Sequence, residues 1–115
     1  MSLMNNERIY ISGKVSGTSD YREKFALKEI ELNNKGYTSV NPVKLSKSIE
    51  DSIGAENLKW EDYMRFDIGL MLTCTSIYML RDWKESKGAR LEHDLATDLN
   101  YKIIYEDEND GEQIF

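Results

Sequence analysis

Short runs of apolar, aromatic and β-branched residues recur along this chain, separated by longer segments in which apolar and charged residues mix. The runs have the composition of β-strands and occupy residues 8–12, 37–41, 76–80 and 101–105. The mixed segments that are typical of helices cover residues 21–35, 58–72 and 87–99. Because parallel strands need crossover connections, this alternation predicts an α/β protein with helices on both faces of a mostly parallel sheet of about four strands.

Two kinds of segment fall outside this alternation. Pro42 is expected to end the second strand, and the polar residues 44–56 to form a mobile connection with at most a short helical turn. A connection of this length is often functional. Residues 1–6 and 106–115 are expected to be loosely ordered around one domain spanning residues 1–115.

Composition narrows the classes of function. Hydrophobic residues make up 40% and charged residues 31%, as in globular proteins. The net charge of -6 gives no general attraction to a phosphate backbone or an anionic membrane, so polymeric nucleic acid and membranes are not expected partners. No apolar run approaches the roughly 20 residues of a membrane span. The first residues lack the features of a signal peptide, so we expect a cytoplasmic protein.

The chain has one cysteine, Cys74, and one histidine, His93. A single cysteine forms no intrachain disulfide, and its apolar surroundings predict a buried, inert thiol. One cysteine and one histidine make no metal-binding cluster, and we expect no metal and no other cofactor. His93 lies roughly 100° around the helix from Glu92, so it is interpreted as a surface or packing residue.

Three polar residues stand out on successive elements: Tyr10 in the first strand, Asp67 within an apolar stretch, and Glu92 after a glycine-containing loop. The loops that follow the first and third strands of such a sheet converge on one crevice, and Glu92 is expected on the first turn of its helix. Each residue also has an ordinary interpretation. Tyr10 fits a simple strand position, Asp67 can pair with Arg65 or Lys59, and Glu92 can be solvated near the helix dipole.

Two carboxyl groups in one pocket have a definite use at a glycosidic bond. One attacks the anomeric carbon, and the other, with a raised pKa, protonates the leaving group. A tyrosine hydroxyl can orient the pair by hydrogen bonding. Residues 13–18 add backbone N–H groups, hydroxyls and Lys14 ahead of a helix, which suits a phosphate or sugar, but they match neither a P-loop nor a dinucleotide fingerprint.

From Ile9 to Tyr105 the chain resembles the nucleoside 2-deoxyribosyltransferase-like superfamily, particularly its small DUF4406-type members from bacteria and phages. The segments that carry the resemblance are Ile9–Gly13, Gly36–Tyr37, Asn41–Pro42, Trp60–Met64 leading to Asp67, and Ser86–Glu92. The last segment is the most specific, because the superfamily's nucleophilic glutamate follows such a loop. The resemblance implies a flavodoxin-like or Rossmann-like three-layer sandwich.

The resemblance also implies roles for single residues. Glu92 matches the nucleophile that forms a covalent deoxyribosyl-enzyme, Asp67 the aspartate that assists proton transfer to the leaving base, and Tyr10 the tyrosine that positions both. Ser86 aligns with a phosphate-binding serine of the branch that hydrolyses deoxynucleoside 5'-monophosphates. The residues expected to bind substrate are Ser12, Gly13, Lys14, Ser86, Gly88 and Arg90.

Two positions depart from the superfamily's pattern. Arg90 stands where a second glycine is frequent, and it either narrows the pocket or binds phosphate. Thr75 stands where an aspartate is common at the start of the third strand.

We therefore expect an enzyme that acts on the N-glycosidic bond of 2'-deoxynucleosides or their 5'-monophosphates and transfers the sugar to a base or to water. Its partner is a small nucleoside or nucleotide, and relatives imply a homodimer or larger homo-oligomer. The alternative is a non-catalytic nucleotide-binding module of the same fold, such as a sensor or phage accessory protein. A structural interaction protein is a third possibility, for which the acidic tail is the only positive sign.

Overall fold

The structure, a computed structural model, describes residues 7–106. Its strands, α-helices and two single turns of 3-10 helix follow one another as β1 (Arg8–Ser12), α1 (Tyr21–Asn34), β2 (Thr38–Val40), α2 (Pro42–Ile53), η1 (Ala55–Asn57), α3 (Trp60–Met71), β3 (Ser76–Met79), η2 (Trp83–Glu85), α4 (Lys87–Asp98) and β4 (Lys102–Tyr105). The strands and the three helices predicted from sequence each begin and end within two residues of these bounds.

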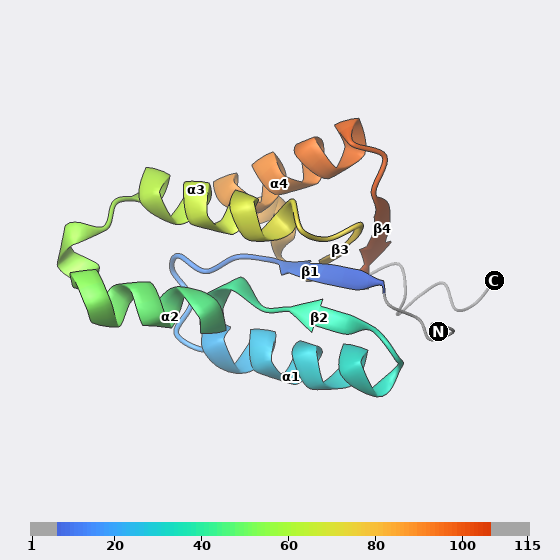
Figure 1. The fold of residues 1–115 in the computed structure, drawn as a ribbon, viewed down its shortest axis with the longest axis horizontal. Helices are drawn as coiled ribbons and strands as arrows, with labels where there is room; N and C mark the ends of the chain where they lie inside the picture. The colour runs from blue at the N-terminus through green and yellow to red at the C-terminus, as the bar shows by residue number, and fades with distance from the viewer. Residues whose placement is uncertain (1–6, 107–115) are drawn as a thin grey trace.

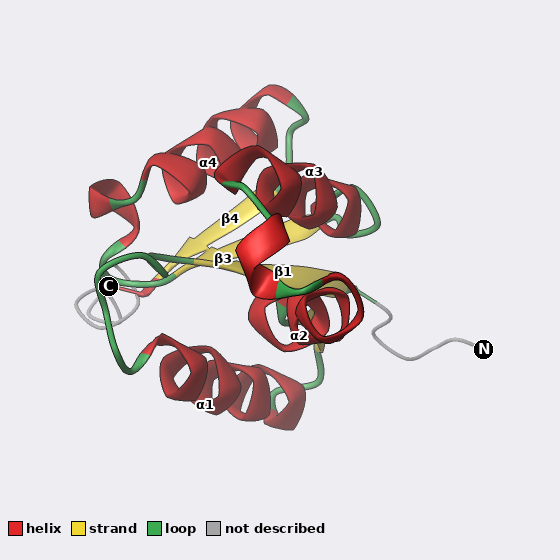
Figure 2. Ribbon diagram, turned by 90° about the vertical axis from the view of Figure 1, so that its left-hand side faces the viewer, coloured by secondary structure: helices red, strands yellow, loops and turns green. Residues whose placement is uncertain are grey.

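The four strands form one parallel sheet in the order β2-β1-β3-β4. Helices α1 and α2 cover one face and α3 and α4 the other, which gives three layers (Figure 2). This arrangement confirms the predicted α/β fold and is consistent with a flavodoxin-like sandwich. The chain leaves β1 toward β2 on one side and later returns to β3 on the other, so the strand order reverses at β1. Such a reversal opens a crevice at the carboxyl ends of the strands.

Successive side chains of β1 enter different halves of the core because side chains alternate across a strand. Ile9 and Ile11 pack beneath α1 and α2 with Phe25, Leu32 and other apolar residues. Tyr10 lies on the opposite face and packs with apolar side chains from α3, β3 and α4. The sheet therefore separates two cores, and β1 contributes to both.

Helix α2 corrects the prediction for residues 44–56, most of which form a regular helix rather than a mobile connection. Asn41 caps the helix, since its side chain accepts hydrogen bonds from the backbone N–H groups of Val43 and Lys44. Pro42 occupies the first helical turn, where its missing N–H costs nothing. Gly54 then ends the helix with a φ of 96°, a conformation that favours glycine.

Helices α2 and α3, joined by η1, extend beyond the carboxyl ends of the strands (Figure 1). They form a wall outside the sheet edge where the crevice opens. None of the helices in the described part of the chain has the length and apolar character to cross a bilayer.

The expectation of loose order at residues 1–6 and 107–115 lies outside the described residues. Glu106 is held in place, because its side chain accepts a hydrogen bond from the backbone N–H of Arg81 at 2.7 Å.

Candidate functional site

A cavity of about 400 Å³ lies at the carboxyl end of β1, between helices α1 to α4. The polar residues and glycines at its inner end include Tyr10, Ser12, Gly13, Asp67, Ser86, Gly88 and Glu92. The outer wall includes Tyr21, Arg22, Phe25, Ser46, Glu50, Trp60, Tyr63 and Met64.

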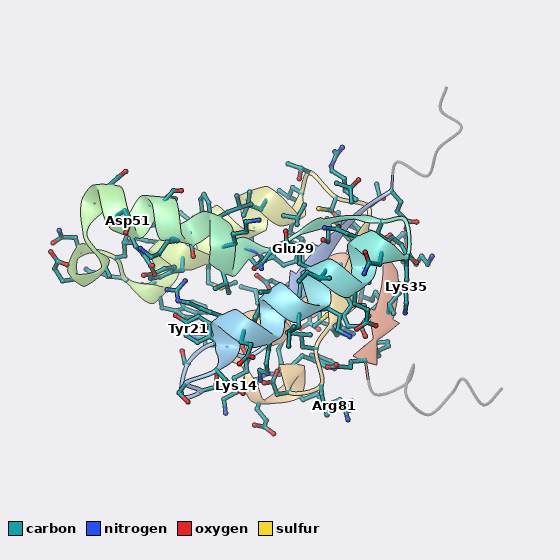
Figure 3. All side chains as sticks on the ribbon, turned by 90° about the horizontal axis from the view of Figure 1, so that it is seen from below. Lys14, Tyr21, Glu29, Lys35, Asp51 and Arg81 are labelled. Carbon is teal, nitrogen blue, oxygen red and sulfur yellow. The ribbon has the colours of Figure 1, made fainter. Side chains whose placement is uncertain are left out.

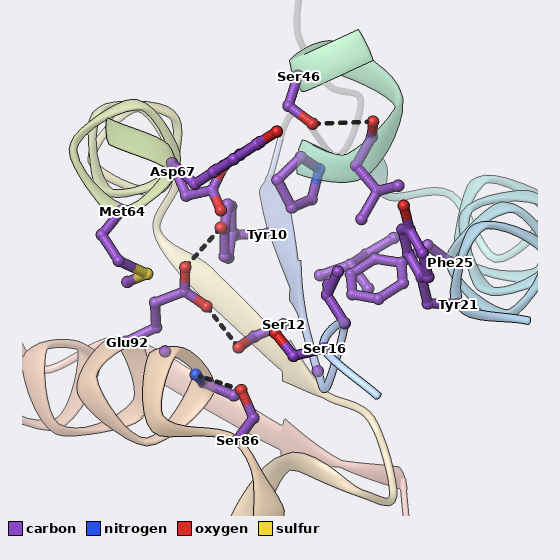
Figure 4. Close-up of a pocket in the computed structure, with 18 of the residues that line it drawn as sticks. Tyr10, Ser12, Ser16, Tyr21, Phe25, Ser46, Met64, Asp67, Ser86 and Glu92 are labelled. Atoms are coloured by element: carbon purple, nitrogen blue, oxygen red, sulfur yellow. Dashed lines mark hydrogen bonds between the residues drawn. The ribbon is translucent and has the colours of Figure 1, made fainter. Parts of the chain in front are cut away.

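Glu92 is the centre of the inner end. Its side chain is buried, and both of its carboxylate oxygens accept hydrogen bonds from hydroxyl groups of β1. Tyr10 Oη donates to Glu92 Oε2 at 2.7 Å, and Ser12 Oγ donates to Glu92 Oε1 at 2.6 Å (Figure 4). Tyr10 and Ser12 point to the same face because they are two positions apart on a strand. The strand therefore fixes the carboxylate's orientation through both oxygens.

The structure corrects the predicted position of Glu92. Helix α4 begins at Lys87, which places Glu92 on the second turn rather than the first. The interpretation of Glu92 as a solvated residue near the helix terminus is wrong, because Glu92 is only 5% exposed. A carboxyl group buried this deeply requires partners or a proton.

Asp67 reaches the same cavity from α3 (Figure 4). Its Oδ1 atom is buried and has no hydrogen-bond partner within the described residues. The alternative ion pair with Arg65 does not form, because the Arg65 guanidinium donates to Asp62 at 2.6 Å. The cavity thus holds a second carboxyl group that forms no ion pair with any cation of residues 7–106.

Burial determines the protonation of this pair. It raises the pKa of Asp67 from 3.8 to about 7. Burial likewise raises the pKa of Glu92 from 4.5 to about 7, where hydrogen bonds from Ser12 and Tyr10 oppose the rise and the charge of Asp67 adds to it. Burial, followed by the charge of Glu92, raises the pKa of Tyr10, so its phenol keeps its proton as a donor. The hydroxyls of Tyr10 and Ser12 favour the charged form of Glu92, and no donor within residues 7–106 does the same at Asp67 Oδ1.

The loop before α4 positions this end of the cavity. Ser86 caps α4 by accepting a hydrogen bond from the backbone N–H of Ala89 at 3.1 Å. A Cβ atom on Gly88 would lie 3.0 Å from Met64 Sδ, so glycine lets α4 approach α3. A Cβ atom on Gly13 would lie 2.6 Å from Leu80 Cδ1. Ser86, Gly88 and Gly13 line the cavity, and each also has a packing or capping role; that they bind substrate stays a prediction.

Lys14 and Arg90 do not line the cavity. Lys14 lies on the loop after β1 (Figure 3), where its Nζ forms an ion pair with Glu85 at 3.3 Å. Arg90 is exposed, and its Nη1 donates to the backbone carbonyl of Lys84 at 2.9 Å. Their predicted contact with substrate stays a prediction that requires either side chain to move.

The outer wall was not found from sequence. Its polar members on α2, Ser46 and Glu50, lie in the segment interpreted as a mobile connection. Tyr21, Phe25 and Tyr63 look like ordinary helix residues until the helices are placed. The pair Asn41-Pro42 is the signal that could have revealed α2, because a capping residue followed by proline is a common helix start.

Within residues 7–106, no group of three or more His, Cys, Asp or Glu side chains is arranged to hold a metal ion.

The packing interpretation of His93 is confirmed, since its ring stacks on Trp83 with 4.3 Å between the ring centres, and its Nε2 lies 2.6 Å from Tyr105 Oη. Cys74 is buried, as predicted.

The fold and cavity define an α/β protein with a carboxyl pair at the edge of a parallel sheet. The family model described as "Domain of unknown function (DUF4406)" matches residues 7–105, which is most of the chain. The chain therefore belongs to the DUF4406 family. No curated protein and no solved structure matches it.

Proposed function

We propose that this protein cleaves the N-glycosidic bond of 2'-deoxynucleosides or their 5'-monophosphates, with Glu92 as the nucleophile. The observation that carries the proposal is the buried Glu92 carboxylate, held through both oxygens by Tyr10 and Ser12 beside the unpaired carboxyl of Asp67. The resemblance of Ser86–Glu92, Asp67 and Tyr10 to the nucleoside 2-deoxyribosyltransferase-like superfamily supports the same assignment.

In the first step, a Glu92 oxygen attacks C1' of the deoxyribose while the C1'–N bond breaks. The bonding electrons leave with the base, and protonated Asp67 donates its proton to a base nitrogen. The products are a free base, a deoxyribosyl ester of Glu92 and an ionised Asp67. Burial favours this arrangement, because it raises the pKa of Asp67 to about 7, which suits a group that gives and takes a proton near neutral pH.

In the second step, water or an acceptor base attacks C1' from the vacated side. Asp67 removes a proton from the attacking group, the ester bond breaks, and the Glu92 carboxylate is restored. Two inversions at C1' give overall retention. Hydrolysis and transfer therefore share the same machinery and differ only in the acceptor.

Tyr10 and Ser12 act as positioning residues for Glu92. Their hydroxyls favour the charged form of the carboxylate against the effect of burial and restrict its rotation, which presents one oxygen to the sugar. During attack, charge leaves the Glu92 carboxylate, so these hydrogen bonds weaken, and the negative charge resides on Asp67 once it has given its proton to the base.

The direct test uses purified wild-type protein with each 2'-deoxynucleoside and 5'-monophosphate, with and without a free acceptor base. Chromatography measures released or exchanged base. We expect turnover in the wild type and a loss of about 1000-fold or more in Glu92→Gln, which preserves the shape of the side chain. Glu61→Gln, at an exposed position of α3, is the charge-matched control and should retain full activity.

Failure of the wild type to release base from any substrate would overturn the proposal. If nucleotides then raised the melting temperature without product, the non-catalytic binding module would be favoured instead. Unchanged turnover in Glu92→Gln would exclude Glu92 as nucleophile. The homodimer or larger assembly expected from the resemblance stays a prediction.

A further inference from the structure

The outer wall of the cavity contains a carboxylate that the proposed chemistry does not use. Glu50 extends from α2, and its side chain is 17% exposed where it lines the cavity. Of the acidic residues lining this cavity in the described part of the chain, only Glu50 lies outside the pair of Asp67 and Glu92. Its position on α2 places it on the wall that extends beyond the sheet edge.

Two neighbouring helices hold the Glu50 carboxylate. Arg22 Nη2 from α1 donates to Oε1 at 3.2 Å, and Tyr63 Oη from α3 donates to Oε2 at 2.8 Å. Burial, together with the hydrogen bond to Glu50, raises the pKa of Tyr63 to about 12, so its phenol remains a donor. Each carboxylate oxygen accepts one hydrogen bond from the protein and has a further lone pair available. The carboxylate is thus fixed in orientation and able to accept from a ligand.

The residues around Glu50 suit a flat ligand. Tyr21, Trp60 and Tyr63 give the outer wall aromatic surface, whereas Phe25 is only 1% exposed. Aromatic side chains stack on planar heterocycles, and such contacts are tolerant of which heterocycle is present. Discrimination between heterocycles then depends on the polar groups at the wall, because only these read the pattern of donors and acceptors.

We propose that Glu50 is the residue that reads the base, and that it selects a base edge with two adjacent N–H donors. Among the common bases, guanine presents this edge through its N1–H and its 2-amino group. Both oxygens of one carboxylate can accept from these donors at once. Hypoxanthine lacks the 2-amino group, adenine and cytosine offer an unprotonated ring nitrogen beside their amino group, and thymine offers one N–H between two carbonyls. This inference rests on the proposed function for placing the sugar at Glu92.

Binding measurements test the inference separately from the chemistry. The Glu92→Gln protein, which should not consume its ligands, is titrated calorimetrically with 2'-deoxyguanosine and 2'-deoxyinosine, which differ only in the 2-amino group. We expect 2'-deoxyguanosine to bind about 10-fold or more tightly. Adding Glu50→Gln should reduce this preference to about 3-fold or less, because the amide has one acceptor oxygen and no charge.

Two further variants separate recognition from a structural role of Glu50. Tyr63→Phe keeps the aromatic wall but removes the hydrogen bond that orients Oε2, so a partial loss of the same preference is expected. Glu56→Gln makes the same charge change at an exposed position of η1 and should leave the preference unchanged. A fall in affinity for both nucleosides by the same factor in Glu50→Gln would show a structural role only and overturn the inference.

The outcomes distinguish the two proposals. Equal affinities for the two nucleosides in a protein whose wild type releases base would overturn the role of Glu50 and leave the chemistry intact. A preference for 2'-deoxyguanosine that depends on Glu50, in a protein that never releases base, would support the role of Glu50 and overturn the chemistry. No binding of either nucleoside would overturn the role of Glu50.

Discussion

The two faces of β1 are equally buried and chemically opposite. Ile9 and Ile11 point beneath α1 and α2 and are fully buried among apolar side chains. Tyr10 and Ser12 point toward α3 and α4, where they are just as inaccessible but donate hydrogen bonds to Glu92. One strand thus contributes to an apolar core alone on one side, and to a second apolar core together with a polar site on the other.

The difference shows how a small domain accommodates buried charge. On the face of Ile9 and Ile11, burial itself stabilises the fold by roughly 25 cal/mol per Å² of apolar surface. On the face of Tyr10, burial of a carboxyl group costs free energy, which the two hydroxyl donors offset for Glu92. Asp67 Oδ1 receives no such hydrogen bond from the part of the chain that the structure describes. The apolar face is therefore expected to govern stability, and the polar face to govern activity.

The largest expected effect on stability comes from the apolar face. Leu32→Ala removes a side chain that is 1% exposed between α1 and the sheet, which should lower the free energy of unfolding by about 2–5 kcal/mol. Turnover per folded molecule should change little, because Leu32 lies outside the cavity. Urea titration gives the stability and base release gives the activity. If the folded fraction of Leu32→Ala also lost most of its activity, the apolar face would govern activity as well as stability, contrary to this comparison.

Removing the carboxyl group of Asp67 should change how the free energy of unfolding depends on pH. The folded protein holds the Asp67 proton up to a pKa of about 7, whereas the ordinary value is 3.8. Between these values the folded state binds more protons than the unfolded state, so stability falls as pH rises through the window. Asp67→Asn removes this contribution and should flatten the fall by on the order of 1–4 kcal/mol.

Urea denaturation of the wild type and of Asp67→Asn at pH 4, 6 and 8 measures this effect, and a second variant serves as the matched control. Asp98→Asn makes the same change at an exposed position of α4 and should leave the pH dependence as in wild type. The raised pKa of Glu92 also makes stability fall as pH rises, so part of the pH dependence of stability remains in Asp67→Asn. A slope identical to wild type would show that folding does not raise the pKa of Asp67.

The site's inner end could be anticipated from sequence because topology leaves few alternatives. Once the sheet is parallel, Tyr10 and the loop before Glu92 must meet at one edge. The burial of Asp67 followed from its apolar neighbours. The hydrogen bond from Ser12 to Glu92 was not anticipated, although the two-residue spacing from Tyr10 permits it.

The outer wall could not be anticipated, because Asn41-Pro42 has two valid physical interpretations. Proline ends a central strand by lacking an N–H, and it also begins a helix for the same reason. Helix α2 buries Pro42, Val43 and Ser46, of which Ser46 is small and polar, so its buried apolar side chains lie in the first turn only. The contact of Glu50 with Tyr63 further depends on how α2 and α3 cross, which no local pattern specifies.

Two buried tyrosines on neighbouring strands offer a sharper comparison of the faces. Tyr10→Phe leaves Glu92 Oε2 without its donor, so the pKa of Glu92 should rise and turnover should fall by roughly 10-fold or more. Because Glu92 attacks as a carboxylate, the acidic limb of the pH–rate profile should move to higher pH. Tyr78→Phe, on the opposite face, is the control and should leave that limb in place. If the acidic limb of the pH–rate profile stayed in place in Tyr10→Phe, the role of Tyr10 would be limited to packing.

The smallest expected effect separates the two roles of Ser86. Ser86→Ala removes the cap on α4 and should lower stability by about 1 kcal/mol. Ser86→Asp preserves the cap, since aspartate is as good a capping residue, but it places a negative charge beside the cavity. If a 5'-phosphate binds here, the aspartate variant should keep its stability and lose affinity for 5'-monophosphates while retaining affinity for nucleosides. Equal affinity of the aspartate variant for both ligand classes would mean that Ser86 acts on the polar face only by starting the helix that carries Glu92.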